Sequence, residues 1–331
     1  MTSYWQGKKV LVTGAGGFIG SHLIERLVLE GAQVRAFVRY NSRGDPGLIT
    51  QLQQPVQEHI EVIAGDLRDQ QALITSAHGV SIIFHLGALI AIPYSYLHPY
   101  EVVESNVMGT LNVLLAGQTA GVERIVHTST SEVYGSALRV PIDENHPLQG
   151  QSPYSASKIG ADKLVESFYC AFNQPVVTIR PFNTYGPRQS ARAVIPTIIT
   201  QLATGSKLRI GNLSSRRDFT YVTDTVAGFL KGGEIPGIEG QTFNLGTGSE
   251  ISIQDLVNEI GRISGKPVDL LIEPERLRPE KSEVTRLLSD NSRARQVLGW
   301  EPLVNISDGL SRTYQWISEH LSHYNVGIYQ K

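Results

Sequence analysis

The chain has 331 residues, of which 41% are hydrophobic and 18% charged, and its formal net charge is −2. This is enough apolar material for one large domain or two smaller ones, and the near balance of charge excludes a basic surface for nucleic acid. The single cysteine, Cys170, excludes an internal disulfide, and its aromatic neighbours predict that it is buried.

Membrane partners are not expected either. The N-terminal residues contain no apolar signal region, and the most apolar stretch, 82–93, is too short to span a bilayer. We therefore expect a cytoplasmic protein.

Short apolar runs alternate with helical patterns through the first half of the chain. Six runs predict strands, at 9–13, 34–38, 60–64, 81–86, 124–128 and 176–180, and helices are expected between them, at about 18–30 and 100–120 among other places. Strands that alternate with helices are typical of an α/β fold with a doubly wound, Rossmann-type parallel sheet.

The sequence pattern changes after Pro181, where loops rich in glycine, proline, serine and arginine separate short predicted helices such as 253–264 and 306–321. We expect a nucleotide-binding Rossmann domain over residues 1–180. Residues 181–331 would form a smaller α/β region, mainly for substrate binding, although the chain could cross between the two parts.

The segment between the first strand and the first helix is rich in glycine and reads Gly14-Ala15-Gly16-Gly17-Phe18-Ile19-Gly20. Glycine is required where a backbone turns tightly and approaches a pyrophosphate closely. The helix N-terminus adds free N–H groups and the positive end of its dipole. In this strand–turn–helix setting the segment predicts an NAD(P)-binding site.

The ends of the next strands predict which cofactor is bound. An acidic residue after the second strand would bind the ribose 2′-hydroxyl of NAD, but Arg39 stands there and suits a 2′-phosphate, which favours NADP over NAD. Asp66 and Leu67 are expected at the adenine. Leu86 and Ala88 are expected under the phosphates and the nicotinamide ribose.

Four residues in two short motifs carry the predicted chemistry. Tyr154 and Lys158 are four residues apart and share one face of a helix, so the ammonium favours the phenolate and lets the tyrosine accept a proton from an alcohol. Glu132, in Thr130-Ser131-Glu132, follows the fifth strand and enters the crevice where such sheets bind ligands. A second base of this kind predicts further chemistry after the oxidation of a sugar.

These motifs resemble the extended short-chain dehydrogenase/reductase superfamily over essentially the whole chain. Within it, residues 129–135 and 152–158 look like those of the nucleotide-sugar 4,6-dehydratases. Val38-Arg39 and the Thr-Ser-Glu order are similar to GDP-mannose 4,6-dehydratase, a family that uses NADP. The run 151–188 looks closest to the dehydratases of legionaminic-acid-type pathways, which act on an N-acetylglucosamine nucleotide, and this suggests UDP- or GDP-N-acetylglucosamine as substrate.

The resemblance implies a catalytic role for each of these residues. Tyr154, supported by Lys158 and the Thr130 hydroxyl, would deprotonate the C4 hydroxyl while a hydride leaves C4 for the nicotinamide. Glu132 would then remove the C5 proton, the C6 hydroxyl would leave as water, and the hydride would return at C6 to give a 4-keto-6-deoxy sugar. Ser131 stands where the dTDP-glucose enzymes carry an aspartate, so Glu132 itself or a water would protonate the leaving hydroxyl.

The resemblance also implies the substrate contacts. Asn183 and Arg188 belong to a loop near the nicotinamide and the sugar phosphate. Arg217 and Arg278 are candidate clamps for the diphosphate, since a guanidinium donates two hydrogen bonds to a phosphate. Ser131 would lie beside the sugar.

Two alternatives to a dehydratase stay open at this point. A UDP-glucuronate-type decarboxylase or a 4-epimerase would use the same scaffold, although epimerases that resemble this chain generally lack a glutamate at position 132. A non-enzymatic binding protein is the other alternative, and the intact catalytic residues argue against it. No metal-ligand spacing is present, and the resemblance implies a homodimer that packs through helices 100–120 and 153–172.

Overall fold

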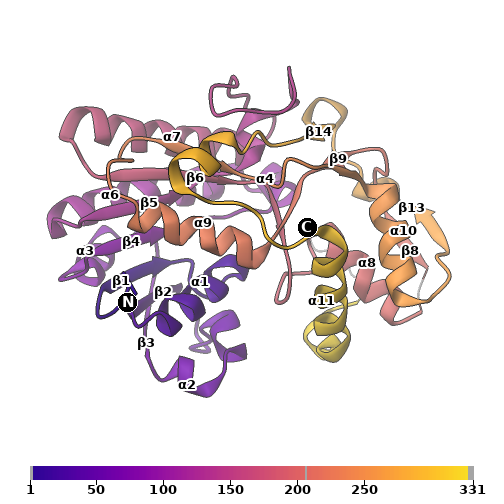
Figure 1. Cartoon of the computed structure of the whole chain (residues 1–331), viewed down its shortest axis with the longest axis horizontal. Helices are drawn as coiled ribbons and strands as arrows, with labels where there is room; N and C mark the ends of the chain where they lie inside the picture. Colours follow the sequence, from indigo (N-terminus) through magenta and orange to yellow (C-terminus); the bar gives the residue numbers. More distant parts are fainter. Residues whose placement is uncertain (1–2, 206, 327–331) are drawn as a thin grey trace.

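Seven parallel strands form the central sheet of the computed structural model, which describes residues 3–205 and 207–326. The strand order is β11-β6-β5-β4-β1-β2-β3 (Figure 1). The bounds are β1 Lys9–Thr13, β2 Gln33–Arg39, β3 Ile60–Gly65, β4 Ile82–His85, β5 Arg124–Thr128, β6 Val176–Pro181 and β11 Thr242–Leu245. The six strands predicted from the apolar runs all form, and the Rossmann-type fold class is confirmed.

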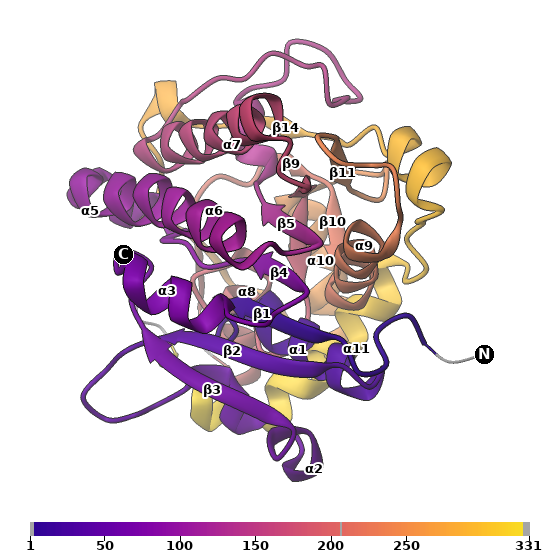
Figure 2. The same cartoon turned by 90° about the vertical axis from the view of Figure 1, so that its left-hand side faces the viewer.

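Helices cover both faces of the sheet, which explains why its strands are apolar along most of their length. One face carries α3 (Gln70–Ala77), α6 (Gly109–Ala120) and α7 (Pro153–Phe172), and the other carries α1 (Phe18–Leu29) and α9 (Val222–Glu234) (Figure 2). Leu73, Val113 and Phe168 belong to the first core layer, and Leu23 and Phe229 belong to the second. The crevice between β1 and β4, where the chain reverses its direction of winding, is the place where such sheets bind ligands.

The seventh strand comes from beyond the predicted domain boundary. β11 pairs in parallel with β6, with Thr242 opposite Thr178, and α9 packs against β4, β5 and β6. The chain therefore returns to the sheet after residue 220. β11 was not predicted because it has only four residues, and such a short apolar run between loops is not recognisable as a strand in the sequence.

The long helix predicted at about 100–120 forms with an interruption. α5 (Pro99–Val103) and α6 are joined by a turn of π-helix at Glu104–Met108, a feature often found at functional sites. Asn106 in this turn is buried. Its side chain accepts a hydrogen bond from the Leu89 N–H (2.8 Å) and donates to the Leu89 carbonyl (3.0 Å) and to Ser157 Oγ (2.9 Å). Through Asn106, the turn of π-helix thus links the loop after β4 to the start of α7.

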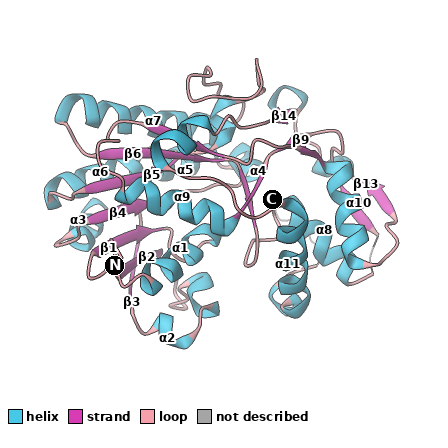
Figure 3. Ribbon diagram, in the orientation of Figure 1, coloured by secondary structure: helices cyan, strands magenta, loops and turns pink. Residues whose placement is uncertain are grey.

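The remaining elements, apart from α2 (Gln54–Gln57), lie mainly beside the carboxyl ends of the strands (Figure 3). The other helices are α4 (Ile92–Leu97), α8 (Val194–Ala203), α10 (Ile253–Ser264) and α11 (Ile306–Glu319). Short strands pair as β7 (Asn183–Tyr185) with β10 (Phe219–Tyr221), and β8 (Leu208–Ile210) with β13 (Leu270–Ile272). A third small sheet contains β9 (Arg216–Arg217), β12 (Ile251–Ser252) and β14 (Arg286–Leu287).

The structure also tests the predictions about Cys170 and about membrane-spanning helices. Cys170 is exposed on α7, so the prediction of a buried packing role is wrong: its aromatic neighbours flank it along the helix but do not cover it. None of the helices in residues 3–205 and 207–326 has the length and apolar character needed to cross a membrane.

Candidate active site

The glycine-rich turn after β1 forms a cradle closed by backbone. Gly14 has φ +70°, and a Cβ there would lie 2.7 Å from the Gly87 nitrogen. A Cβ at Gly20 would lie 2.2 Å from the Gly14 carbonyl oxygen. α1 begins at Phe18, and its N-cap, Gly17, provides no side-chain cap. The first N–H groups of the helix are therefore available to an anion such as a pyrophosphate, and the cradle fits a dinucleotide.

A cleft of about 640 Å³ opens from this turn. Most of the residues predicted to bind the cofactor or to react line it: Gly14, Gly16, Gly17, Phe18, Ile19, Gly20, Arg39, Leu86, Ala88, Thr130, Ser131, Glu132, Tyr154 and Asn183. The structure thus brings the glycine turn and both catalytic motifs to one cleft at the carboxyl ends of the strands.

Asp66 and Leu67 do not line this cleft. Arg68 holds the Asp66 carboxylate at 2.8 Å. Leu67 packs beneath the cleft floor: a Cβ at Gly87 would lie 2.9 Å from its Cδ1, and its carbonyl accepts a hydrogen bond from Asn112. A role for Asp66 and Leu67 at the adenine stays a prediction.

A loop that was not predicted from the sequence lines the cleft beside the glycine turn. Asp45, Pro46 and Gly47 line the cleft, and the Leu48 N–H donates to the Gly16 carbonyl at 3.0 Å. The Asp-Pro-Gly order is a turn signal that marks the loop. No local pattern, however, indicates that the loop packs on a segment 30 residues away.

Tyr154 and Lys158 are presented by the first turns of α7. The helix begins here because the Ser152 hydroxyl accepts the Ser155 N–H at 3.0 Å, and the Ser155 hydroxyl accepts the Ser152 N–H at 2.9 Å. Both reactive side chains are buried, and Lys158 Nζ donates to the Thr128 carbonyl at 2.7 Å. The ammonium is therefore fixed at the end of β5.

Burial dominates the electrostatics of this pair. It raises the pKa of Tyr154, as do the nearby charges of Glu132 and Asp162, while a hydrogen bond with Thr130 acts in the opposite direction. Burial lowers the pKa of Lys158 to about 8, against the opposing influence of Asp162. Within the protein, Thr130 is therefore the group that favours ionisation of Tyr154, and help from the Lys158 charge stays a prediction.

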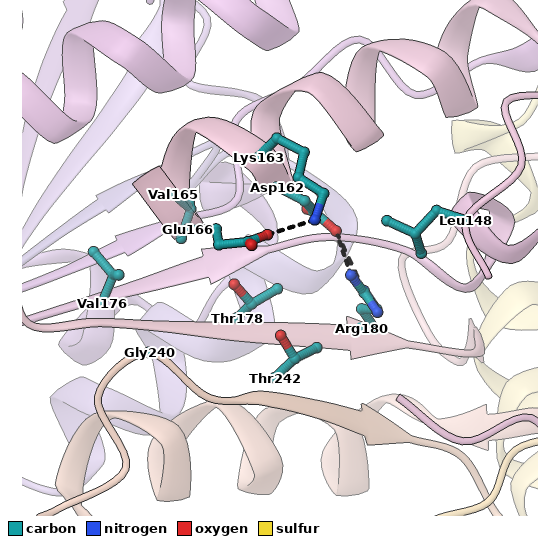
Figure 4. Close-up of a pocket in the computed structure, with 10 residues that line it drawn as sticks. All are labelled: Leu148, Asp162, Lys163, Val165, Glu166, Val176, Thr178, Arg180, Gly240 and Thr242. Atoms are coloured by element: carbon teal, nitrogen blue, oxygen red, sulfur yellow. Dashed lines mark hydrogen bonds and ion pairs between the residues drawn. The ribbon is translucent and has the colours of Figure 1, made fainter. Parts of the chain in front are cut away.

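A buried polar cluster behind Lys158 escaped the sequence analysis. Asp162, one turn further along α7, accepts hydrogen bonds from Ser129 Oγ (2.7 Å) and Arg180 Nη2 (2.9 Å), and it meets His127 Nε2 at 3.0 Å. Figure 4 shows Asp162 and Arg180 joined beside a cavity of about 120 Å³. Burial raises the pKa of Asp162, but His127 and Arg180 outweigh it and bring the value to about 2.

His85 completes the polar layer under the cleft. Its ring nitrogens meet Thr13 Oγ1 at 2.8 Å and Thr110 Oγ1 at 3.0 Å, and its ring lies 5.7 Å from that of His127. Burial lowers the pKa of His85 well below its ordinary value, so the ring is neutral at pH 7. Both histidines are buried and hydrogen-bonded, and neither lines the cleft.

The Thr-Ser-Glu motif forms a short turn directly after β5. The Thr130 hydroxyl accepts the Glu132 N–H at 3.2 Å, and Ser131 is buried. The Glu132 side chain is 14% exposed and reaches within 3.7 Å of Arg278 Nη1. Glu132 and Tyr154 therefore line the same cleft from two different elements.

A second cavity of about 310 Å³ adjoins the cleft, and Asn183, Thr184, Gln189 and Ala193 line both. It is rich in arginine: the predicted Arg217 and Arg278 line it together with Arg192, Arg209 and Arg276, which the sequence analysis missed. These arginines come from segments far apart in the chain, so no local pattern groups them. The cavity suits an anionic part of a ligand whose other end lies in the cleft.

Arg188 is not brought to either cavity. Its guanidinium is buried against α1, where it pairs with Glu25 and contacts the ring of His22. A role for Arg188 in substrate binding stays a prediction, and this arrangement does not support it. Arg188 has φ +68°, and its side chain links the 180–188 loop to the first helix.

Comparison with known proteins agrees with this geometry. The family model described as GDP-mannose 4,6 dehydratase matches residues 11–313. The chain is 33% identical to a UDP-glucose 4-epimerase of Mycolicibacterium smegmatis, over 93% of this chain and 98% of that protein. It is 31% identical to a dTDP-D-glucose 4,6-dehydratase of Mus musculus, over 96% and 90%.

A solved structure shares the whole architecture. The dTDP-glucose 4,6-dehydratase DesIV from Streptomyces venezuelae, solved with NAD and TYD bound, superposes with a TM-score of 0.83 at 28% identity, covering 96% of this chain and 99% of that one. With the glycine cradle and the Tyr154–Lys158 pair in place, the chain belongs to the GDP-mannose 4,6-dehydratase family of extended short-chain dehydrogenases/reductases, which includes nucleotide-sugar 4,6-dehydratases and 4-epimerases.

Proposed function

We propose that the protein is a 4,6-dehydratase of a nucleotide hexose and forms a 4-keto-6-deoxy sugar. The observation that carries this proposal is the presence of two bases in one cleft, Tyr154 from α7 and Glu132 from the turn after β5. A nicotinamide bound in the cleft would accept a hydride and later return it. An oxidoreductase that acted on the alcohol alone would need only the tyrosine.

The residues of this chain would divide the proton transfers. Tyr154 takes the proton of the C4 hydroxyl, since the Lys158 charge and the Thr130 hydroxyl favour its ionised form. Glu132 removes the C5 proton, which the neighbouring C4 ketone makes acidic. With Ser131 in place of an acid, Glu132 passes its proton to the departing C6 hydroxyl, directly or through a water. When the hydride returns to C6, a proton from water adds at C5, and the proton that Tyr154 took from the C4 hydroxyl returns to the solvent.

We further propose that the substrate is UDP- or GDP-N-acetylglucosamine. The resemblance of residues 151–188 to the legionaminic-acid-type dehydratases supports the sugar. The arginine-rich cavity beside the cleft supports the diphosphate, with Arg217 and Arg278 as ligands and Asn183 between the two cavities.

NADP is the cofactor that we propose, with NAD as the alternative. Arg39 supports NADP because its guanidinium is exposed at the cleft and pairs only loosely with Glu101, at 3.3 Å. A 2′-phosphate would displace this exposed pair at little cost.

A homodimer is supported by an apolar surface on the helices that were expected to pair. Tyr100 and Val103 on α5, Met108 before α6, and Tyr169 and Phe172 on α7 are all exposed. These are the side chains that a helix–helix interface would cover. A cytoplasmic location remains a proposal from the sequence alone.

The competing function is a 4-epimerase, which the similarity to the mycobacterial UDP-glucose 4-epimerase favours. Incubation with UDP- and GDP-N-acetylglucosamine, GDP-mannose, dTDP-glucose, UDP-glucose and UDP-glucuronate, followed by mass spectrometry, separates the candidates. Loss of one water supports the dehydratase. An unchanged mass with an inverted C4, or loss of carbon dioxide, overturns it.

The Glu132→Gln variant tests the second base. It should still oxidise C4 but fail to eliminate water, so reduced cofactor should accumulate in the near-ultraviolet spectrum when substrate is added. A Tyr154→Phe variant is the matched control, because it should bind cofactor yet show no such signal. Elimination at the wild-type rate in Glu132→Gln would refute the role of Glu132.

A further inference from the structure

Glu132 and Arg278 form an ion pair at the junction of the two cavities. Oε2 of Glu132 lies 3.7 Å from Nη1 of Arg278, with side-chain exposures of 14% and 28%. This distance is longer than a hydrogen bond, and Nη1 is enclosed by the protein yet has no hydrogen-bond partner. The guanidinium is thus held near a carboxylate while one of its donors stays unused.

Arg217, which lines the same cavity, is held differently. Its Nη1 donates to the Arg216 carbonyl at 3.0 Å and its Nη2 to the Val284 carbonyl at 2.6 Å, and Glu283 lies 3.6 Å from Nη2. Backbone carbonyls therefore fix the position of Arg217. Arg278 has no such anchor on Nη1, so this donor can turn to an anion in the cavity without breaking a hydrogen bond of its own.

We propose that the substrate diphosphate and Glu132 compete for Arg278, so that binding of a nucleotide sugar releases Glu132 for catalysis. Without substrate, Arg278 neutralises the carboxylate in the cleft. When a diphosphate enters the arginine-rich cavity, it offers Arg278 two oxygens at hydrogen-bonding distance, which a charge-assisted bond strongly favours over a 3.7 Å pair.

The consequence for the reaction is direct. Glu132 then loses its ion pair with Arg278, so its carboxylate oxygens are free to face the C5 proton. A sugar without the diphosphate would leave Glu132 paired. This inference rests on the proposed function, because it needs a nucleotide-sugar substrate and Glu132 as the second base.

A double-mutant cycle on ligand binding tests the competition without measuring turnover. The full-length protein, saturated with its nicotinamide cofactor, is titrated calorimetrically with UDP, dTDP and GDP, and the tightest of the three is then used. Glu132→Gln should tighten its binding about fivefold, since the diphosphate no longer has to displace a carboxylate from Arg278. In the Arg278→Gln background the same change should have a smaller effect, which comes from the charge of Glu132 acting on Arg217.

The other outcomes of this experiment contradict either the competition or the proposed function. Equal tightening by Glu132→Gln in both backgrounds would show general charge repulsion and overturn the competition. Glu283→Gln is the matched control, because it removes a carboxylate that faces Arg217, and its effect should be the same with and without Arg278. If Arg278→Gln does not fold, Arg278→Met replaces it in the cycle. If no nucleoside diphosphate binds to the wild type, the proposed function falls as well, whereas binding without coupling overturns this inference alone.

Discussion

The Asp162 carboxylate lies 2.9 Å from the guanidinium of Arg180, and both side chains are buried on the side of α7 that also carries Tyr154 and Lys158. The ion pair joins the catalytic helix to β6. It also places a negative charge one helical turn from the Lys158 ammonium. The same contact therefore stabilises the fold and keeps the lysine charged near neutral pH.

Replacing Asp162 by Asn should destabilise the protein by about 3–5 kcal/mol, because it leaves the Arg180 charge buried without a partner. Urea unfolding at pH 7 measures the change. Lys163 and Glu166, on the same helix, form an ion pair with both side chains 60% exposed, so Glu166→Gln should cost less than about 1 kcal/mol. Equal costs for the two variants would contradict the role assigned to Asp162.

A second prediction concerns the pH dependence of stability. Burial holds the pKa of His85 well below that of the unfolded chain, so the folded state keeps this ring neutral while the unfolded state binds a proton. The free energy of unfolding should therefore fall as the pH drops from 7 to 5, approaching about 1.4 kcal/mol per pH unit for each such histidine. The Asp162 carboxylate, with a pKa of about 2, does not contribute in this window.

The His85→Asn variant should be less stable at pH 7 but should lose less stability on acidification. Urea unfolding at pH 7, 6 and 5 gives the slope for both proteins. His22, whose pKa is lowered to about 3 mainly by burial, should keep part of the slope in the variant. Identical slopes would show that His85 is not the group that titrates.

Local patterns in the sequence predict the sheet and the reactive pair well. Tyr154 and Lys158 are linked by helical spacing, and the glycine turn is linked to its function by the strand before it. The residues that escaped prediction depend on tertiary contacts. Asp162 and Arg180 meet across two elements, the Asp45–Gly47 loop packs on Gly16, and β11 returns to the sheet from a distant segment.

For Arg188, the sequence predicted a substrate contact that the fold does not bring to either cavity. An arginine beside a ligand-binding loop suits a phosphate, and nothing nearby in the sequence indicates that its side chain turns away. Its direction depends on Glu25 and His22 of α1, which lie more than 160 residues earlier. Residue type therefore predicts what a side chain can bind, and the fold determines whether it reaches the ligand.

A third prediction tests the cofactor preference. Arg39→Asp should weaken NADP binding by one to two orders of magnitude, since a charge-assisted contact to the 2′-phosphate is replaced by repulsion. NAD binding should change little or improve. Fluorescence titration of the reduced cofactors measures both. Equal weakening of NADP and NAD would assign Arg39 a general role and remove the argument for NADP.

The last prediction concerns the apolar surface on α5, α6 and α7. Tyr100 is 79% exposed, and in the proposed dimer it would be covered by the partner helices. Tyr100→Glu should therefore convert a dimer into a monomer, as measured by sedimentation velocity, because a buried unpaired carboxylate opposes association. Leu303, also 79% exposed but outside these helices, is the matched control, and Leu303→Glu should leave the dimer intact. A wild-type monomer, or a dimer that survives the change at Tyr100, would show that these helices do not form the interface.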